Sequence, residues 1–406
     1  MHMNCMPDAS RGSNGSVAWV HGAIEIESGH SCPPCAELLR LRYLKIAVVL
    51  TLLTLAAACG GGSADDDATG AADPATVPSG VGRSFVMGVS SQPVQTSEQA
   101  YRDAFEVAEA AGEVVLIQRA PPWSEFVPGG SISTRTEQLT LLEKDLAEEH
   151  ALQLFLAVDP TTPGDRGQLA NLPEDLTGAG FTDEDVRAAF VAYAKYLALN
   201  YKPAYMALGV EVDMIYRARG DGSFRNFISL YFEAYDAVKS VSADTLVFPT
   251  FQYEDMLGLL NTGSPTLPSW SLVNRFEPKI DVLAVTSYPS LVFNSVADVP
   301  LDYYTALEDR LQKPVMFASV GWNSRTAESP ALDPADSAQV AYLYRVLSAA
   351  ENLGARALVW YLGRDPEAMP AGFEPLAHMG LQDAGGNPKS VWHIWLSALA
   401  RPAVLP

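Results

Sequence analysis

The sequence predicts a closed (β/α)8 barrel, in which eight parallel strands form a ring and helices cover its outside. Eight short apolar runs recur between residue 84 and the end of the chain, and stretches with helical periodicity separate most of them. The runs are apolar on both faces, as are parallel strands that helices cover. The alternative is a doubly wound open sheet, but no glycine-rich phosphate loop follows the first run to support it.

The predicted strands are short and follow one another at intervals that leave room for a helix. They are FVMGV (85–89), VVLIQ (114–118), LQLFLAV (152–158), AYMALGV (204–210), TLVFPTF (245–251), VLAVTSY (282–288), VMFASV (315–320) and RALVWYL (356–362). About 320 residues hold these eight units, which matches the size of one (β/α)8 barrel. We therefore expect a single folded domain over residues 84–406.

Helix signals accompany the predicted strands. Ser97 is a plausible N-cap for the first helix, and Gly112 ends it. Thr182 begins another helix, and the acidic residues in its first turn favour the helix dipole. The predicted helices cover 97–112, 134–150, 182–200, 224–241 and 333–354. The links after the fifth and sixth strands are longer and less regular.

Residues 1–58 are predicted to be an upstream segment followed by an export signal. Basic residues precede an apolar run over 46–58, which is too short to span a membrane comfortably and has the length of a signal-peptide core. Cys59 follows at once, as in bacterial lipoprotein signals, where the cysteine is acylated after cleavage. An ordinary secretory signal cut after Ala58 is the alternative. Because the signal is complete from about residue 39, we expect translation to start near there.

Residues 59–83 are predicted to form a flexible, acylated tether, since small and polar residues dominate this stretch. The chain is then an exported bacterial lipoprotein of the cell envelope, with membrane contact only through the lipid on Cys59. Gly60, where inner-membrane lipoproteins of this class carry Asp, favours the outer membrane or cell surface.

Composition excludes some functions. A net charge of −21 disfavours binding to nucleic acid. All four cysteines lie within the first 59 residues, and the CPPC motif at 32–35 has redox or zinc-ligand spacing but lacks a second pair. The histidines after the signal do not cluster. We therefore expect neither a catalytic metal nor a cofactor.

The ends of the predicted strands combine aromatic and polar side chains. Active sites of (β/α)8 barrels lie at these ends, and aromatic planes and carboxylates suit the C–H faces and hydroxyls of sugars. The alternative is that the aromatic residues cap the core and the acids are solvated loop charges. The candidates are Arg119, Trp123, Asp159, Glu211, Asp213, Tyr253, Glu254, Tyr288, Ser319, Trp322 and Trp360.

Five segments resemble the retaining (β/α)8 glycosidase superfamily in their order and approximate spacing. They are YKPAYMALGVEVDMI, IDVLAVTSYPSL, KPVMFASVGWNS, ALVWYL and MGLQDAGGNPKSVWHIW. Within that superfamily the chain most resembles endo-β-1,4-galactanase-type endoglycanases. The resemblance extends from residue 84 to the end and is strongest over 201–395.

The resemblance implies roles for individual residues. Glu211 stands where the family has its general acid/base, and Tyr288 where a tyrosine contacts the nucleophile. Trp360, with Trp322 and Tyr288, would form the floor under the sugar. The chain departs from the family at the nucleophile, where Ser319 replaces Glu.

A second departure is Val210, which replaces the Asn before the acid/base. Three interpretations therefore remain open. The first is an envelope glycosidase on β-linked polysaccharide, whose second carboxylate lies about 5–5.5 Å (retaining) or about 6.5–9.5 Å (inverting) from that of Glu211. Its candidates are Asp159, Asp213, Glu254, Asp255 and Asp365. The second is a non-catalytic lipoprotein that binds polysaccharide or oligosaccharide. The third is a structural or assembly lipoprotein.

Overall fold

The structure is a computed structural model that describes residues 82–260, 268–308, 310, 312–325, 332–370 and 372–404, apart from the side chains of 332–337. The predicted upstream segment, signal and tether, with Cys59, lie outside these residues except for Gly82 and Arg83. No helix within the described part of the chain is long and apolar enough to cross a membrane.

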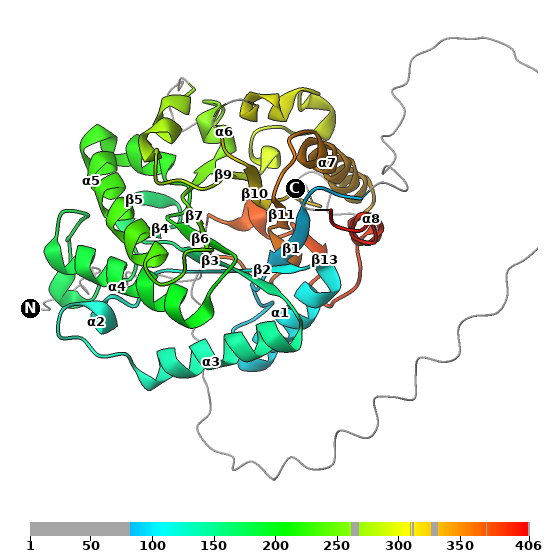
Figure 1. Cartoon of the computed structure of the whole chain (residues 1–406). Coiled ribbons are helices and arrows are strands. Elements are labelled where there is room, and N and C mark those ends of the chain that lie inside the picture. Colours follow the sequence, from blue (N-terminus) through cyan, green and yellow to red (C-terminus); the bar gives the residue numbers. More distant parts are fainter. Residues whose placement is uncertain are drawn as a thin grey trace, which may run out of the picture. The chain divides into compact units, whose positions relative to one another are not determined.

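Nine parallel strands form one sheet, in the order β7-β6-β3-β2-β1-β11-β10-β9-β8, which curls into a nearly closed barrel (Figure 1). The strands are β1 (Val86–Ser90), β2 (Val114–Arg119), β3 (Gln153–Val158), β6 (Tyr205–Leu208), β7 (Leu246–Phe248), β8 (Thr250–Gln252), β9 (Leu283–Ser287), β10 (Val315–Val320) and β11 (Ala357–Trp360). Their residues are almost all buried, since the barrel interior and the covering helices enclose both faces.

The ninth strand arises because Pro249 divides the fifth predicted strand into β7 and β8. β7 pairs with β6, and β8 pairs with β9. Proline has no N–H to donate, so it interrupts the ladder. Beyond it, the Thr250 backbone N–H donates to the Gly209 carbonyl at 3.1 Å. The two pieces thus serve as one strand, and the predicted (β/α)8 barrel is confirmed.

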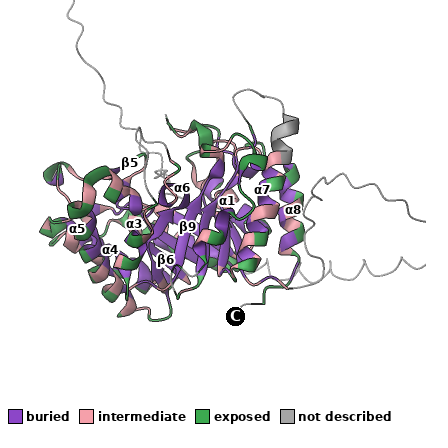
Figure 2. Ribbon diagram, turned by 90° about the horizontal axis from the view of Figure 1, so that it is seen from above, coloured by how far each residue is buried: buried purple, intermediate pink, exposed green. Residues whose placement is uncertain are grey.

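Helices follow the strands and pack around the barrel. They are α1 (Glu98–Ala111), α2 (Trp123–Phe126), α3 (Thr134–Glu149), α4 (Glu184–Tyr201), α5 (Asp213–Lys239), α6 (Tyr253–Met256), α7 (Leu332–Asn352) and α8 (Ser390–Leu399). Figure 2 shows buried residues concentrated in the strands and exposed residues on the outer sides of the helices. The irregular links predicted after the fifth and sixth strands contain short 3-10 turns, at 270–276, 289–291, 296–298 and 303–307.

Two helix starts differ from the sequence prediction. Ser97 caps α1 as expected, since its hydroxyl accepts from the Ala100 N–H at 3.1 Å. The N-cap of α4, however, is Asp183 and not Thr182. α5 begins at Asp213, well before residue 224, and Gly220 with φ of 75° interrupts it. Because glycine adopts positive φ without steric cost, the chain can pass from one helical stretch to the next there.

Two small sheets extend the loops at the carboxyl ends of the barrel strands. β4 (Thr161–Thr162) and β5 (Asp165–Leu169) form an antiparallel hairpin directly after β3. β12 (Leu362–Arg364) and β13 (Gly380–Gln382) pair in parallel after β11. The hairpin is the more important of the two for the site, because it brings an arginine over the mouth of the barrel.

Candidate functional site

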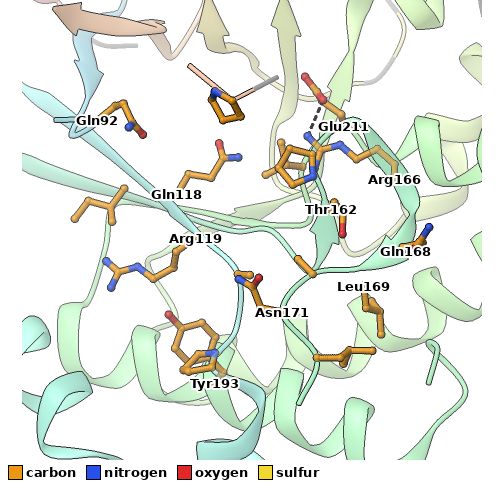
Figure 3. A pocket seen from close by; sticks show the side chains of 18 of the residues that line it. Gln92, Gln118, Arg119, Thr162, Arg166, Gln168, Leu169, Asn171, Tyr193 and Glu211 are labelled. Atoms are coloured by element: carbon orange, nitrogen blue, oxygen red, sulfur yellow. Dashed lines mark hydrogen bonds and ion pairs between the residues drawn. The ribbon is translucent and has the colours of Figure 1, made fainter. Parts of the chain in front are cut away.

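An open cavity of about 1330 Å³ lies at the carboxyl ends of the barrel strands. Figure 3 shows part of its wall, to which β2, the β4–β5 hairpin, α4 and the end of β6 contribute. Wall residues at or just after six of the strands are Ser90, Arg119, Glu211, Thr286, Ser319 and Tyr361. This is the face on which (β/α)8 barrels hold their active sites.

Glu211 enters the cavity from a strained turn that follows β6. Gly209 has φ of 113° and Glu211 has φ of 52°, and the latter conformation costs a residue with a Cβ about 1–3 kcal/mol. The Glu211 N–H donates to Thr250 Oγ1 at 3.0 Å, which holds the turn against the neighbouring strand β8. The side chain is 16% exposed and reaches the cavity.

Both carboxylate oxygens of Glu211 accept hydrogen bonds from the protein. Arg166 Nη2 donates to Oε2 at 2.7 Å, the contact that Figure 3 marks with a dashed line. Thr286 Oγ1, at the end of β9, donates to Oε1 at 2.9 Å. Glu211 is therefore held from two sides, by the hairpin and by the barrel wall.

Arg166 bridges Glu211 to a second carboxylate. Its Nη1 donates to Asp159 Oδ2 at 2.6 Å, and the two side chains are 6% and 1% exposed. Burial raises the pKa of Asp159, although the charge of Arg166 works in the opposite direction. Burial would lower the pKa of Arg166, but the charges of Asp159 and Glu211 raise it by more, so the guanidinium remains cationic.

The side of the cavity formed by β9 and β10 carries hydroxyls. Tyr288 donates its hydroxyl to Ser319 Oγ at 2.8 Å. Burial, and then the charge of Glu211, raises the pKa of Tyr288 well above its usual value, so the phenol stays protonated. Tyr361 packs edge-on against Tyr288, with ring centroids 5.4 Å apart. A hydroxyl therefore stands where the resemblance places the nucleophilic carboxylate.

The other glutamates in the cavity wall belong to its α3 side. Glu125 accepts from the backbone N–H of Ser133 at 2.9 Å and from its hydroxyl at 2.8 Å, so it holds the start of α3. Glu143, on α3 itself, pairs with Arg119. Neither glutamate belongs to β9 or β10, the strands that carry Thr286 and Ser319. Neither therefore replaces the carboxylate at the position of Ser319.

Four of the predicted site residues line the cavity: Arg119, Glu211, Tyr288 and Ser319. The predicted tryptophans lie elsewhere. Trp360 is fully buried and packs against Trp395 of α8, with ring centroids 5.9 Å apart. Trp322 packs against Tyr342 of α7 at 5.6 Å. Trp123 is buried and donates its indole N–H to the Ala170 carbonyl at 2.7 Å.

The remaining predicted residues are buried and do not line the cavity. Asp213 accepts from the Gln252 N–H at 2.9 Å, and burial, followed by the nearby charge of Asp255, raises its pKa well above the usual value. Glu254 is fully buried and accepts from the Tyr288 N–H at 3.1 Å; burial raises its pKa. Tyr253 lies in the same layer, and its hydroxyl donates to the Tyr303 carbonyl. Asp159 is likewise buried and acts through Arg166.

Sequence reasoning missed Arg166, Thr286 and Tyr361 as cavity residues. Successive strand residues point to opposite faces, so a buried, helix-facing Trp360 implies that its neighbour Tyr361 faces the barrel mouth. That alternation is a usable signal. Arg166 has a weaker one: the TTPGDRG segment combines Pro and Gly as turns do. Neither signal indicates that the arginine folds back onto Glu211.

No group of three or more potential metal ligands among His, Cys, Asp and Glu occurs within the described parts of the chain. The polar side chains that line the cavity carry hydroxyls, carboxylates, amides and guanidinium groups.

No protein-family model and no curated protein sequence matches the chain. Solved structures do match. An exo-β-1,4-mannosidase from Opitutaceae bacterium strain TAV5 aligns with a TM-score of 0.61 and 18% identity, over 79% of this chain and 60% of the mannosidase. A GH5_18 variant from Streptomyces cattleya, solved with Manβ1-4GlcNAc, aligns with a TM-score of 0.61 and 16% identity, over 78% and 81% of the two chains.

A β-glucosidase from Thermotoga maritima, solved with glucoimidazole, aligns with a TM-score of 0.52 and 12% identity, over 75% of this chain and 87% of that one. At such identities these matches show the fold alone, which is the (β/α)8 barrel that glycosidases use. The predicted likeness to barrel glycosidases is thereby confirmed at the level of fold. The likeness to galactanase-type enzymes stays a prediction.

Proposed function

We propose that the cavity binds a β-linked oligosaccharide and that the protein holds this ligand without cleaving it. The observation that carries the proposal is the bonding of Glu211, whose two oxygens accept from Arg166 and Thr286. A general acid in glycoside hydrolysis has to donate a proton to the leaving oxygen. A carboxylate that already accepts from a guanidinium is suited to accept a sugar hydroxyl as well.

The nucleophile position supports the same proposal. Retaining hydrolysis requires a second carboxyl group about 5–5.5 Å from the first. Ser319 offers a hydroxyl, whose Oγ accepts from Tyr288. A serine attacks only when a neighbouring base activates it, and a protonated phenol that donates to it is not such a base.

The size and lining of the cavity suit a saccharide. Its volume of about 1330 Å³ exceeds the ~300–1,000 Å³ of typical small-ligand pockets, so it has room for more than one sugar ring. Tyr288 and Tyr361 provide aromatic surface for C–H faces. Gln118 and Thr286 provide polar groups for hydroxyls. Proteins of similar fold are named as β-mannosidase and β-glucosidase, which supports a β-linked ligand.

Hydrolysis is the second candidate, and the position of Glu211 favours it. The residue lines the cavity at the end of β6, where the galactanase-type resemblance places a general acid/base for β-1,4-linked polysaccharide. The second carboxylate that hydrolysis requires would have to come from a residue other than Ser319, which occupies the nucleophile position. Asp159 shares Arg166 with Glu211, but it does not line the cavity.

We further propose that the protein is an envelope lipoprotein anchored through Cys59, at the outer membrane or cell surface. The apolar run followed directly by a cysteine supports this. Cys59→Ser should move the protein from the membrane fraction to the soluble exported fraction in a bacterial expression host. An unchanged distribution would show that Cys59 is not the anchor.

The test of function measures binding and cleavage on the same samples. Isothermal titration calorimetry would use β-1,4-linked galactotetraose, cellotetraose and mannotetraose, and a reducing-sugar assay would follow each overnight. The variants are Glu211→Gln and the control Arg102→Gln, which alters only a surface ion pair on α1. We expect at least one tetrasaccharide to bind and to remain intact. Its affinity should fall about tenfold in Glu211→Gln and stay unchanged in the control.

Two results would overturn the proposal. Release of reducing ends that Glu211→Gln abolishes would establish hydrolysis. Absence of binding by all three tetrasaccharides would favour a structural or assembly role for the barrel.

A further inference from the structure

Arg119 presents unused hydrogen-bond donors to the cavity. It ends β2, lines the cavity wall, and its side chain is 17% exposed. Its Nη2 donates to both oxygens of Glu143, at 2.5 and 2.6 Å. A guanidinium carries five N–H groups. Among the described residues, no hydrogen bond runs from Nε or Nη1 of Arg119, which leaves three N–H groups for a ligand.

Glu143 does not depend on Arg119 alone. Tyr101 and Tyr201 donate their hydroxyls to its two oxygens, each at 2.5 Å. Burial, and then the charge of Glu143, raises the pKa of both tyrosines well above their usual value, so they remain protonated donors. The carboxylate is thus fully hydrogen-bonded, while the guanidinium beside it is only partly so.

The charge of the cavity wall differs from that of the whole chain. The chain has 27 Lys and Arg against 48 Asp and Glu. The described wall reverses this balance, with four arginines against three glutamates. These are Arg119, Arg135, Arg166 and Arg219, and Glu125, Glu143 and Glu211. Asp159 pairs with Arg166 and balances the two signs, so the site lacks the acidic excess of the chain and does not repel an anionic ligand.

We propose that the saccharide bound in this cavity carries a carboxylate, as a uronic acid does, and that Arg119 donates to that carboxylate from Nη1. Such a hydrogen bond is charge-assisted on both sides, which makes it stronger than one to a neutral sugar hydroxyl. Glu211, at the other end of the wall, accepts a hydroxyl of the same saccharide. The inference rests on the proposed function and specifies its ligand class.

The experiment compares matched neutral and acidic disaccharides by calorimetry at low and high salt. One pair is cellobiose and β-glucuronosyl-1,4-glucose, and the other is β-1,4-mannobiose and β-1,4-dimannuronate. The wild type should bind the acidic member of at least one pair about tenfold or more tightly, a difference of about 1.4 kcal/mol. High salt should reduce this preference, because it screens the ion pair.

Variants of Arg119 identify the group responsible. Arg119→Gln combined with Glu143→Gln removes both charges together, which avoids an unpaired buried carboxylate. This double variant should lose the acidic preference, and a circular dichroism spectrum that matches the wild type shows that it folds. Arg119→Lys keeps the charge but replaces the planar guanidinium by a single ammonium group, so it should retain only part of the preference. The surface variant Arg102→Gln is the control and should behave as wild type.

The outcomes distinguish the acidic-ligand inference from the proposal that the cavity binds a saccharide. Equal affinity for neutral and acidic sugars would overturn the inference and leave saccharide binding intact. A preference that survives in the double variant would overturn the role of Arg119. Binding of neither disaccharide, together with failure of the tetrasaccharides, would overturn both proposals.

Discussion

Two arginines in the same cavity wall are paired in different ways. Arg166, on the β4–β5 hairpin, donates to Asp159 and Glu211 through its two terminal nitrogens and is 6% exposed. Arg119, at the end of β2, donates through Nη2 to Glu143 alone and is 17% exposed. The first joins two strand ends into one rigid unit. The second has one side in the protein and the other in the cavity.

The difference separates architecture from recognition. Buried polar groups are stable when every donor and acceptor has a partner, and an unmatched donor is costly unless a ligand or water meets it. Both terminal nitrogens of Arg166 donate to carboxylates, Nη1 to Asp159 and Nη2 to Glu211, so its role is to shape the site. Arg119 keeps donors for an incoming oxygen, so its role is to select the ligand.

Loss of Arg166 should have the largest effect on stability. Arg166→Met leaves Asp159, which is 1% exposed, without a cation, and breaking a buried pair in this way costs about 3–5 kcal/mol. Urea unfolding followed by circular dichroism measures the loss. Adding Asp159→Asn should restore part of it, because no buried charge then remains unpaired. A loss below about 1 kcal/mol would show that Arg166 does not brace the site.

Loss of Arg119 should cost less. Arg119→Met leaves Glu143 buried, but Tyr101 and Tyr201 continue to donate to it, so we expect about 1–3 kcal/mol. The same unfolding assay compares the two variants directly. A loss equal to that of Arg166→Met would contradict this distinction, since Arg119 would then stabilise the fold as much as Arg166 does.

Asp213 contrasts with the two arginine-paired acids, because it is a buried acid whose neighbour, Asp255, is also an acid. Its folded-state pKa is raised by burial and then by Asp255. A group whose pKa is raised by folding stabilises the protein fully at pH values below its unfolded-state pKa, which is about 3.9 for Asp. This contribution is lost as pH rises through the folded-state pKa. Asp213→Asn keeps an oxygen for the Gln252 N–H and has no proton to lose. The wild type should therefore lose stability relative to this variant as pH rises from about 4.

The control for that series is Asp298→Asn, at an exposed position in a 3-10 turn. Denaturant midpoints at several pH values should separate Asp213→Asn from the wild type and leave the control parallel to it. Parallel curves for all three proteins would contradict the account of Asp213.

Thr286→Val should have the smallest effect. It removes the donor to Glu211 Oε1 and leaves the Arg166 contact, so we expect a loss of about 0.5–1.5 kcal/mol in stability. Affinity for the tetrasaccharide that binds should also fall, because Glu211 is then held from one side only. A loss above about 3 kcal/mol would mean that Thr286, and not Arg166, is the main support of Glu211.

The barrel could be predicted from the sequence because strand and helix periods are local signals. The apolar run at 204–210 correctly placed Glu211 just beyond a strand end. The division at Pro249 was missed, because residues 245–251 were predicted as one strand although proline cannot donate to a ladder. The early start of α5 at Asp213 was harder to foresee, because the run after Glu211 includes Gly220, which lowers helix propensity.

The site could be predicted only in part, because side-chain direction depends on packing. Trp360 was expected at the sugar, yet it packs against Trp395 on the helix side of the barrel. Asp213 and Glu254 are charged residues and such residues are mostly exposed, yet both are buried. The contact between Arg166 and Glu211 joins residues 45 positions apart, and no local pattern specifies it.

The most direct test of the central claim is native mass spectrometry of the protein mixed with the tetrasaccharide that binds most tightly, after overnight incubation. The account predicts a complex whose mass equals protein plus intact tetrasaccharide, with no shorter sugars released. Appearance of shorter sugars with the wild type and not with Glu211→Gln would contradict it, because Glu211 would then be donating a proton and not only accepting hydrogen bonds.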